Sequence, residues 1–331
     1  APIRNGSPLV GDGETLWAAL PDFDLVAVVD RAGGTVRGHL PVCHTPRSLG
    51  LLHGALAVAC SGDDTVEVWD AAAGTLRETL SFDAGSAPWA ALPGPDGSLS
   101  VLLRATGQIA SRDDDASLME VVEAAADLRG GAAVGDQVLA TRFRSDDDVG
   151  QVWDSTAGPL ELPRDPGPDS DTGARGVPTY LGQVAIAPSG ERAAVVGLQA
   201  NVERGLYREG RALTHETTAR ATLRLLDLTT GEQAARRAFD DRDLASAAAW
   251  SPRGDWLYVA THGMETVEVL DPWTLQLASA FLNVGHGPSG LWADDEAVWV
   301  LCGLSRELVA FDLRELGSPQ RELTRIDLVP S

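Results

Sequence analysis

A unit of four short strands recurs along this chain, and no other feature limits its possible folds as strongly. The unit is clearest between Ala248 and Trp292, where Val-, Leu- and Trp-rich segments alternate with turns that contain Gly, Pro and Asp. Strands are expected there at 248–250, 256–261, 266–271 and 277–284. Short strands of this composition, separated by such turns, indicate antiparallel sheet. Four of them recurring every 40 residues or so is typical of a β-propeller blade.

Seven such units can be traced along the 331 residues. They span residues 4–42, 43–84, 85–126, 127–174, 175–245, 248–292 and 287–328. The third is the least regular, and within it we expect residues 120–126 to form an outer strand. A closed ring leaves no long sheet edge exposed, and neighbouring blades bury their faces against each other. We therefore expect an all-β fold, a seven-bladed β-propeller with four-stranded antiparallel blades, in which residues 1–331 form a single domain.

Residues 199–220 are an insertion in the fifth unit, between its second and third expected strands. A segment of this length does not fit within a blade, so we expect it to project from one face of the ring. Residues 163–175 are rich in Pro, Gly and Asp and are expected to form an irregular loop.

Charge excludes several classes of function. The chain has 48 acidic and 26 basic residues, a net charge of −22, and every basic residue is Arg. Such a chain cannot neutralise many phosphates, so we expect no nucleic-acid partner and no anionic membrane surface. Without Lys there is no Schiff-base chemistry. No apolar run is long enough to cross a bilayer, so we expect no membrane insertion.

The three cysteines, Cys43, Cys60 and Cys302, allow at most one internal disulfide. A Cys43–Cys60 bond is geometrically conceivable, but small buried thiols are the more common outcome and are what we expect. The chain contains no Cys-x-x-Cys-His motif, so no c-type haem is attached within it.

Several repeat motifs resemble those of YVTN-family β-propellers, which occur in secreted and surface prokaryotic proteins. These motifs are the Ser251-Pro-Arg-Gly and Ala187-Pro-Ser-Gly turns, the strands 257–261 and 266–271, and the segment 284–291. The insertion segment 205–220 is similar to a loop of propellers that lie beside di-haem cytochrome c peroxidase-like domains. This resemblance implies a periplasmic or extracellular location and a c-type cytochrome or di-haem peroxidase-like domain as partner.

Four of the six histidines are expected on one face of the ring. His44 and His286 occupy equivalent loops that enter a blade, His262 lies in a loop between second and third strands, and His215 lies in the insertion. Converging imidazoles bind copper or zinc, which makes these residues candidate metal ligands. The more common alternative is that His44 and His286 are turn residues that hydrogen-bond locally. His39 and His53 are expected to be an ordinary strand and an ordinary turn residue.

The same face is expected to carry Arg47, Trp89, Tyr180 and Arg220. Guanidinium and aromatic groups of this kind hold a carboxylate, a haem propionate or a ring, so these are candidate partner-binding residues. The acidic runs 113–115 and 146–148 lack the spacing of a Ca²⁺ loop and are expected to be solvated turns.

No nucleophile lies at a fixed spacing from a base, so the chain alone is expected to be non-catalytic. We expect a binding or scaffold propeller that presents one loop face to a redox partner containing c-type haem. The alternative is a metal-dependent enzyme, or a metal-binding protein, that uses the rim histidines to hold copper or zinc. A plain peptide- or carbohydrate-binding domain is a third possibility, for which no specific motif is present.

Overall fold

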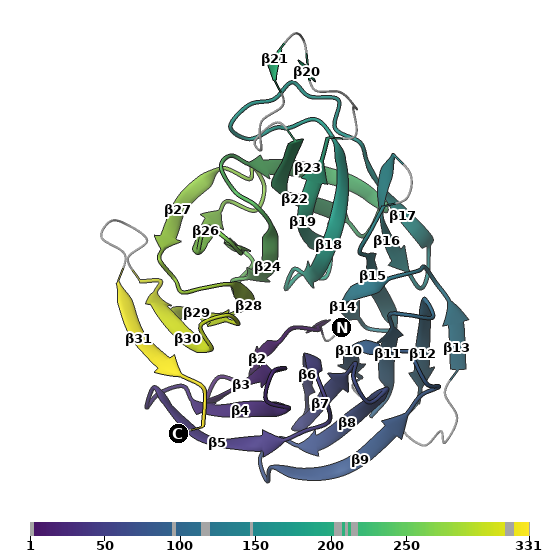
Figure 1. Ribbon diagram of the computed structural model, residues 1–331, viewed down its shortest axis with the longest axis vertical. Helices are drawn as coiled ribbons and strands as arrows, with labels where there is room; N and C mark the ends of the chain where they lie inside the picture. The colour runs from purple at the N-terminus through teal and green to yellow at the C-terminus, as the bar shows by residue number, and fades with distance from the viewer. Residues whose placement is uncertain are drawn as a thin grey trace.

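A computed structural model describes residues 3–94, 97–113, 120–145, 148–201, 207–208, 211–212, 218–314 and 321–330. Seven of its antiparallel sheets are arranged as blades around a common centre, and an eighth is a two-stranded hairpin (Figure 1). Each blade has four strands that run outward in sequence order. The expected all-β, seven-bladed propeller is therefore confirmed.

Blades one to four contain sixteen strands between Leu9 and Pro163. Blade one consists of β2 (Leu9–Gly11), β3 (Thr15–Leu20), β4 (Leu25–Asp30) and β5 (Thr35–Pro41). Blade two consists of β6 (Pro46–Leu52), β7 (Ala55–Cys60), β8 (Thr65–Asp70) and β9 (Thr75–Ser81). Blade three consists of β10 (Pro88–Pro93), β11 (Leu99–Leu103), β12 (Gln108–Arg112) and β13 (Glu120–Glu123), so the expected outer strand is present. Blade four consists of β14 (Leu128–Val134), β15 (Gln137–Arg142), β16 (Val149–Asp154) and β17 (Gly158–Pro163).

Blades five to seven complete the ring. Blade five consists of β18 (Val177–Ile186), β19 (Arg192–Ala200), β22 (Ala219–Asp227) and β23 (Glu232–Phe239). Blade six consists of β24 (Ala245–Trp250), β25 (Leu257–Thr261), β26 (Thr266–Leu270) and β27 (Leu277–Leu282). Blade seven consists of β28 (Pro288–Ala293), β29 (Ala297–Cys302), β30 (Glu307–Asp312) and β31 (Glu322–Asp327).

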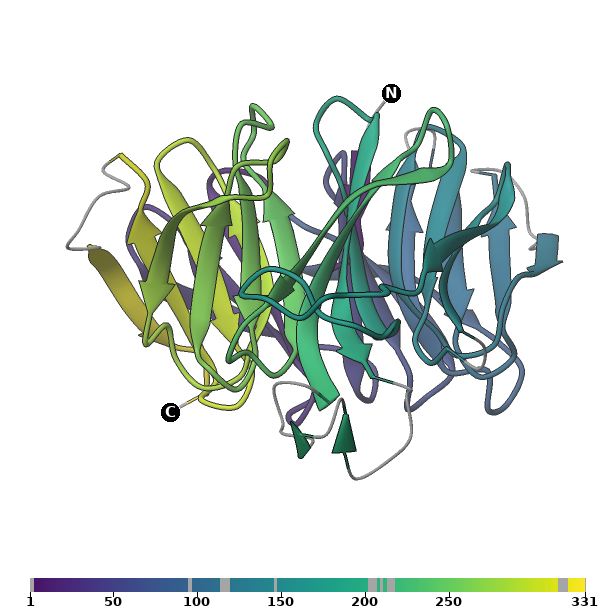
Figure 2. The same ribbon diagram turned by 90° about the horizontal axis from the view of Figure 1, so that it is seen from above.

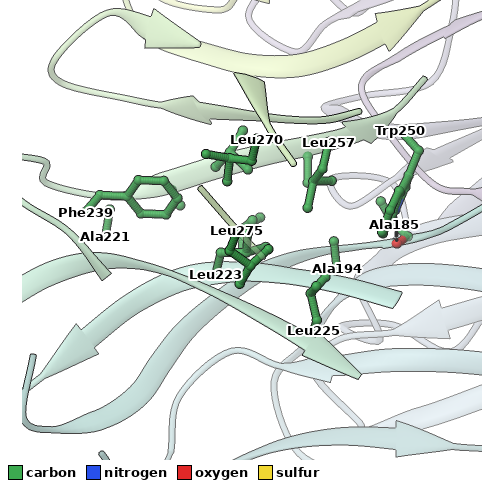
Figure 3. Packing of buried hydrophobic residues seen from close by; sticks show 14 of the residues in the cluster. Ala185, Ala194, Ala221, Leu223, Leu225, Phe239, Trp250, Leu257, Leu270 and Leu275 are labelled. Carbon is green, nitrogen blue, oxygen red and sulfur yellow. Dashed lines mark hydrogen bonds between the residues drawn. The ribbon is translucent and has the colours of Figure 1, made fainter. Parts of the chain in front are cut away.

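The core lies between blades. Figure 3 shows one such layer, in which Leu223 and Leu225 of blade five pack toward Leu257 and Leu270 of blade six. Trp250 closes this layer near the channel and donates a hydrogen bond from Nε1 to the Ala185 carbonyl at 2.9 Å. Each inner strand contains glycine or alanine, and these small residues let the seven sheets approach one another near the axis.

The loops divide between two faces. One face carries the loops between second and third strands and the loops that lead into the next blade. Figure 2 shows the hairpin of β20 (Tyr207–Arg208) and β21 (Arg211–Ala212) on the same side as the C-terminus, with the N-terminus on the other side. We call the first side the insertion face and the second the opposite face. The long strands β19 and β22 continue to Ala200 and from Ala219, so the inserted loop is 201–218.

The N-terminal residues depart from the expected first unit, 4–42. Ile3–Asn5 form β1, which pairs with the inner edge of β14 in blade four. Ser7 then bridges to Leu49 of blade two before the chain enters β2 of blade one. The first residues thus cross the central channel from blade four to blade one. The pairing satisfies part of an inner strand edge that would otherwise face the channel.

The ring closes between blades one and seven through side chains. His39 Nε2 lies 2.8 Å from the Leu328 carbonyl, and Arg31 forms an ion pair with Asp294 at 2.5 Å. His39 is an ordinary strand residue, as expected. Its contact with the Leu328 carbonyl holds the C-terminal segment against β5.

The cysteine expectation is wrong for two of the three residues. Cys43 and Cys60 form a disulfide, with Cα atoms 5.8 Å apart. The β6–β7 hairpin returns the chain so that the end of β7 lies beside the loop that enters β6, which brings the two side chains together. Cys302 is a buried free thiol, as expected, and burial raises its pKa to about 12. No helix in the described part of the chain is long and apolar enough to cross a membrane.

Candidate functional site at the channel mouth

A β-bulge near the start of each of six inner strands shapes the centre of the insertion face. In blades two, three, six and seven the register skips a single residue of the inner strand. The skipped residues are Arg47, Trp89, Ser246 and Ser289. Wider shifts in blades four and five contain Arg129 and Tyr180. A bulge leaves a residue unpaired and redirects its side chain. Arg47, Trp89, Arg129, Ser246 and Ser289 line a cavity of about 160 Å³, which we call the channel mouth.

Three arginines surround Trp89. The guanidinium carbons of Arg47, Arg104 and Arg129 lie 4.9, 4.9 and 4.7 Å from its ring centroid. These arginines come from blades two, three and four, so three neighbouring blades converge on one indole. Cation–π attraction holds each guanidinium close to the ring while its N–H groups remain able to donate hydrogen bonds.

The positive charge of this cluster is only partly compensated. Arg129 pairs with Asp127 at 3.5 Å, and Arg144 shares the same carboxylate at 3.1 Å. Arg47 donates to Ser61 Oγ at 3.1 Å. Among described residues, Arg104 has no ion-pair partner, and its buried Nε has no hydrogen-bond acceptor. Burial, with Arg104 as a further cause, lowers the pKa of both Arg47 and Arg129, which remain charged at neutral pH.

An aromatic pair extends the cluster toward blade five. Arg129 lies over the Phe143 ring at 3.5 Å, and Phe143 meets Tyr180 edge to face with centroids 5.0 Å apart. The structure thus brings together three of the residues singled out in the sequence, Arg47, Trp89 and Tyr180. Sequence analysis missed Arg104, Arg129 and Phe143, although Arg129 follows the first residue of an inner strand, as Arg47 and Trp89 do.

Arg220 lies elsewhere. Its side chain is 7% exposed and forms an ion pair with Asp240 at 3.0 Å. It also donates to the carbonyls of Ser170 and Gly173, and so anchors the loop that precedes β18. Arg220 therefore has an internal role at the base of the insertion.

Two histidines on this face are paired with carboxylates. His44 Nδ1 lies 2.9 Å from the Asp24 carboxylate, which raises the pKa of His44. His286 Nδ1 makes the equivalent contact with Glu265. Both acidic residues end the turn between second and third strands of the preceding blade, so the pairs join consecutive blades.

The four candidate metal ligands do not form one described cluster. His262 lies close to Gly287, next to His286. His44 enters blade two and His286 enters blade seven, so blade one lies between them. His215 lies outside the described residues. No group of three or more His, Cys, Asp or Glu side chains that could hold a metal occurs within the described ranges.

Exposed apolar side chains lie on the turns of three neighbouring blades of the insertion face. Phe23, Met264 and Leu304 are 37%, 48% and 68% exposed and belong to the turns between second and third strands of blades one, six and seven. We call them the apolar arc. Arg306 lies over Phe23 at 5.0 Å. Apolar groups rimmed by polar ones are typical of surfaces that bind other proteins.

The opposite mouth of the channel has a larger but chemically plainer cavity of about 470 Å³. Its lining includes Trp250 and Trp292, and the only charged lining residue is Arg4. Arg4 is 6% exposed and donates to the Gly135 carbonyl. This cavity therefore offers no described group for acid–base chemistry.

Comparison with known proteins supports the fold. No protein-family model matches the chain, and no curated protein matches it. Hydrazine synthase from Kuenenia stuttgartiensis is 16% identical, with a TM-score of 0.71 over 92% of this chain and 93% of that chain. Hsv2 from Kluyveromyces lactis is 13% identical, with a TM-score of 0.57 over 98% and 100%. A chain of the mitotic checkpoint complex is 15% identical, with a TM-score of 0.58 over 82% and 74%. Likeness at these identities shows the propeller fold alone.

Proposed function

We propose that this protein is a binding or scaffold propeller that presents its insertion face to a redox partner containing c-type haem. One observation carries the proposal. A chain with a net charge of −22 gathers three arginines around Trp89 at the centre of this face. A cationic centre in an acidic protein selects a partner group that is itself negative.

The arrangement suits a haem edge in particular. Guanidinium groups bind carboxylates through two parallel hydrogen bonds, and haem propionates are carboxylates. The apolar arc of Phe23, Met264 and Leu304 would cover the partner surface around the haem. The Cys43–Cys60 disulfide supports a periplasmic or extracellular location, because such bonds persist in oxidising compartments. The repeat motifs that resemble YVTN-family propellers point to the same compartments.

Binding to a purified di-haem cytochrome c peroxidase tests the proposal. Surface plasmon resonance should show an affinity that falls with salt, because exposed charges are screened. The triple variant Phe23→Ser, Met264→Ser, Leu304→Ser should weaken binding about tenfold or more, since an exposed apolar anchor contributes about 1 kcal/mol or more to an interface.

The matched control is Trp273→Ser on the opposite face, where Trp273 is 62% exposed. This variant should bind as the wild type does. Equal binding by all three proteins, or no binding by the wild type, would show that the insertion face is not a haem-protein surface.

A metal-binding function is the second candidate, favoured by the carboxylate–imidazole pairs. Asp24 and Glu265 each hold Nδ1 of a histidine and leave Nε2 available, as carboxylates beside metal-bound histidines do. Copper and zinc analysis of protein purified without added ions tests it. A full metal equivalent that is lost in the His44→Ala, His286→Ala double variant, with unchanged thermal stability, would support a metal site that includes His44 and His286.

A further inference from the structure

We propose that the channel mouth is a binding site for a single carboxylate group carried on a small planar body. The carboxylate can belong to a free small molecule or be presented by a protein partner. The second source rests on the proposed function, whereas the first does not.

Charge and geometry argue for a carboxylate. Arg47 and Arg129 reach Trp89 from the two neighbouring blades, and Arg104 reaches it from the same blade. Asp127 is the one carboxylate within ion-pairing distance of these three arginines among described residues. A carboxylate placed among them would offset the remaining positive charge and accept from planar guanidinium donors.

A buried donor at the channel mouth also lacks an acceptor. Ser48 lines the channel mouth, is 5% exposed, and its Oγ has no hydrogen-bond partner among described residues. Buried polar atoms are rarely left unsatisfied, so an acceptor oxygen at this place would stabilise Ser48 Oγ. Arg104 lies behind this lining, over the Trp89 ring, and adds positive charge.

The shape limits the size of the ligand. The cavity of about 160 Å³ is comparable with cavities that hold one benzene-sized molecule. Gly6, Ser7 and Pro8 line it where the N-terminal segment crosses the channel, and Gly130 and Gly182 line it without side chains. A group of benzoate size fits, whereas a nucleotide does not. The Trp89 ring holds the three guanidinium groups in place beside this cavity.

Isothermal titration calorimetry with benzoate and with inorganic phosphate tests the site. Benzoate should bind the wild type, and Arg47→Gln and Arg104→Gln should each weaken it about tenfold, as expected for loss of a charge-assisted contact. Trp89→Leu should also weaken it. Arg77→Gln is the matched control, because Arg77 is an exposed arginine that pairs with Asp70 at the opposite face. Urea unfolding of each variant identifies any loss that comes from misfolding.

The outcomes separate the two sources. A c-type haem peptide with exposed propionates should compete with benzoate if a partner haem supplies the carboxylate. Benzoate binding without such competition would support a free small carboxylate and would count against the haem partner. Absence of benzoate binding at tens of millimolar, binding that Arg47→Gln and Arg104→Gln leave unchanged, or preference for phosphate would each overturn the carboxylate site, whatever the di-haem protein does.

Discussion

The two faces of the ring carry similar numbers of loops but hold them in different ways. On the opposite face, an aspartate ends or directly follows the third strand in six blades, and it accepts hydrogen bonds from the amides of the turn. These residues are Asp30, Asp70, Asp154, Asp227, Asp271 and Asp312. On the insertion face the loops differ from blade to blade, and they are held by a disulfide, by carboxylate–imidazole pairs or by arginines over aromatic rings.

This difference separates two tasks. The repeated aspartate turn forms within a single blade and needs no partner from another blade, so the same turn recurs in six of the blades. The insertion-face contacts reach across blades, since Asp24 of blade one holds the loop that enters blade two. Loops that vary on a regular scaffold are where binding residues concentrate. Variants on the opposite face should therefore affect stability alone, whereas variants on the insertion face should also affect binding.

Of the predicted changes, acidification should lower the stability of the fold the most. It should act mainly by protonating aspartates on the opposite face. Turn amides lower the pKa of Asp30, Asp227 and Asp271, and arginine side chains lower that of Asp70 and of Asp312, the latter to about 2. A lowered folded-state pKa stabilises above the unfolded value of about 3.9 and is lost as pH falls through the folded value. The urea midpoint should therefore fall steeply below about pH 4.

The acid prediction has an internal control. Asp271→Asn keeps an acceptor oxygen in the turn but cannot be protonated, so it should reduce the steepness of the acid loss. A midpoint that is flat between pH 6 and pH 2.5, or a slope that Asp271→Asn leaves unchanged, would show that these turns do not govern acid stability.

Loss of the disulfide should have the next largest effect, and it should act on the insertion face. Cys43 and Cys60 are 17 residues apart in sequence, and a loop of this length stabilises the folded state by about 3 kcal/mol. The Cys43→Ala, Cys60→Ala variant should lose about that amount in urea unfolding. Because Cys43 lies in the loop that leads into β6 and its bulge residue Arg47, benzoate binding should weaken as well. Wild type treated with reductant should match the variant, and a mismatch would point to damage from the substitutions themselves.

Much of the fold follows from the sequence because blade periodicity is a local signal. A blade can be located from its own turns and strands, without reference to neighbouring blades. Examples are the turns near Gly190 and Gly254 and the strand that begins at Thr266. The N-terminal crossing could not be found in this way. Ile3–Asn5 is too short to show a period, and its partner β14 lies more than 120 residues away.

The candidate site was predictable only in part, for a related reason. Arg47 and Trp89 occupy the same position in two repeats, so the sequence could place them at one mouth. That Arg104 joins them depends on the path of a side chain from the turn after β11, which no spacing reveals. Arg220 is a residue type that often binds partners, but its guanidinium donates to internal carbonyls. Only its burial distinguishes the internal role from a binding role.

Asp154 offers a smaller test, confined to stability. It is 2% exposed, accepts from the amides of Thr156 and Ala157, and accepts from Gln137 Nε2 at 2.6 Å. Asp154→Ala should cost about 2 kcal/mol in urea unfolding, since buried hydrogen bonds to a charged acceptor are lost. Benzoate binding should not change. Asp63→Ala is the comparison on the insertion face, where Asp63 is exposed and accepts from the His44 amide at 2.7 Å, and it should cost less. Equal costs would contradict the division of tasks between the faces.

The smallest expected effect concerns His44, and its sign is opposite to that of the aspartate turns. The hydrogen bond to Asp24 raises the pKa of His44 above its ordinary value. A raised folded-state pKa stabilises below the unfolded value of about 6.5, and this contribution is lost as pH rises through the folded value. The difference in urea midpoint between wild type and His44→Gln should therefore be larger near pH 5.5 than near pH 8.5.

His53→Gln is the matched control, because His53 is at a turn of the opposite face and makes no hydrogen bond or ion pair with described residues. An NMR titration of the His44 ring, repeated in Asp24→Asn, measures the cause directly. If the His44 pKa is the same in both proteins, the pair that joins blades one and two has no electrostatic role in stability.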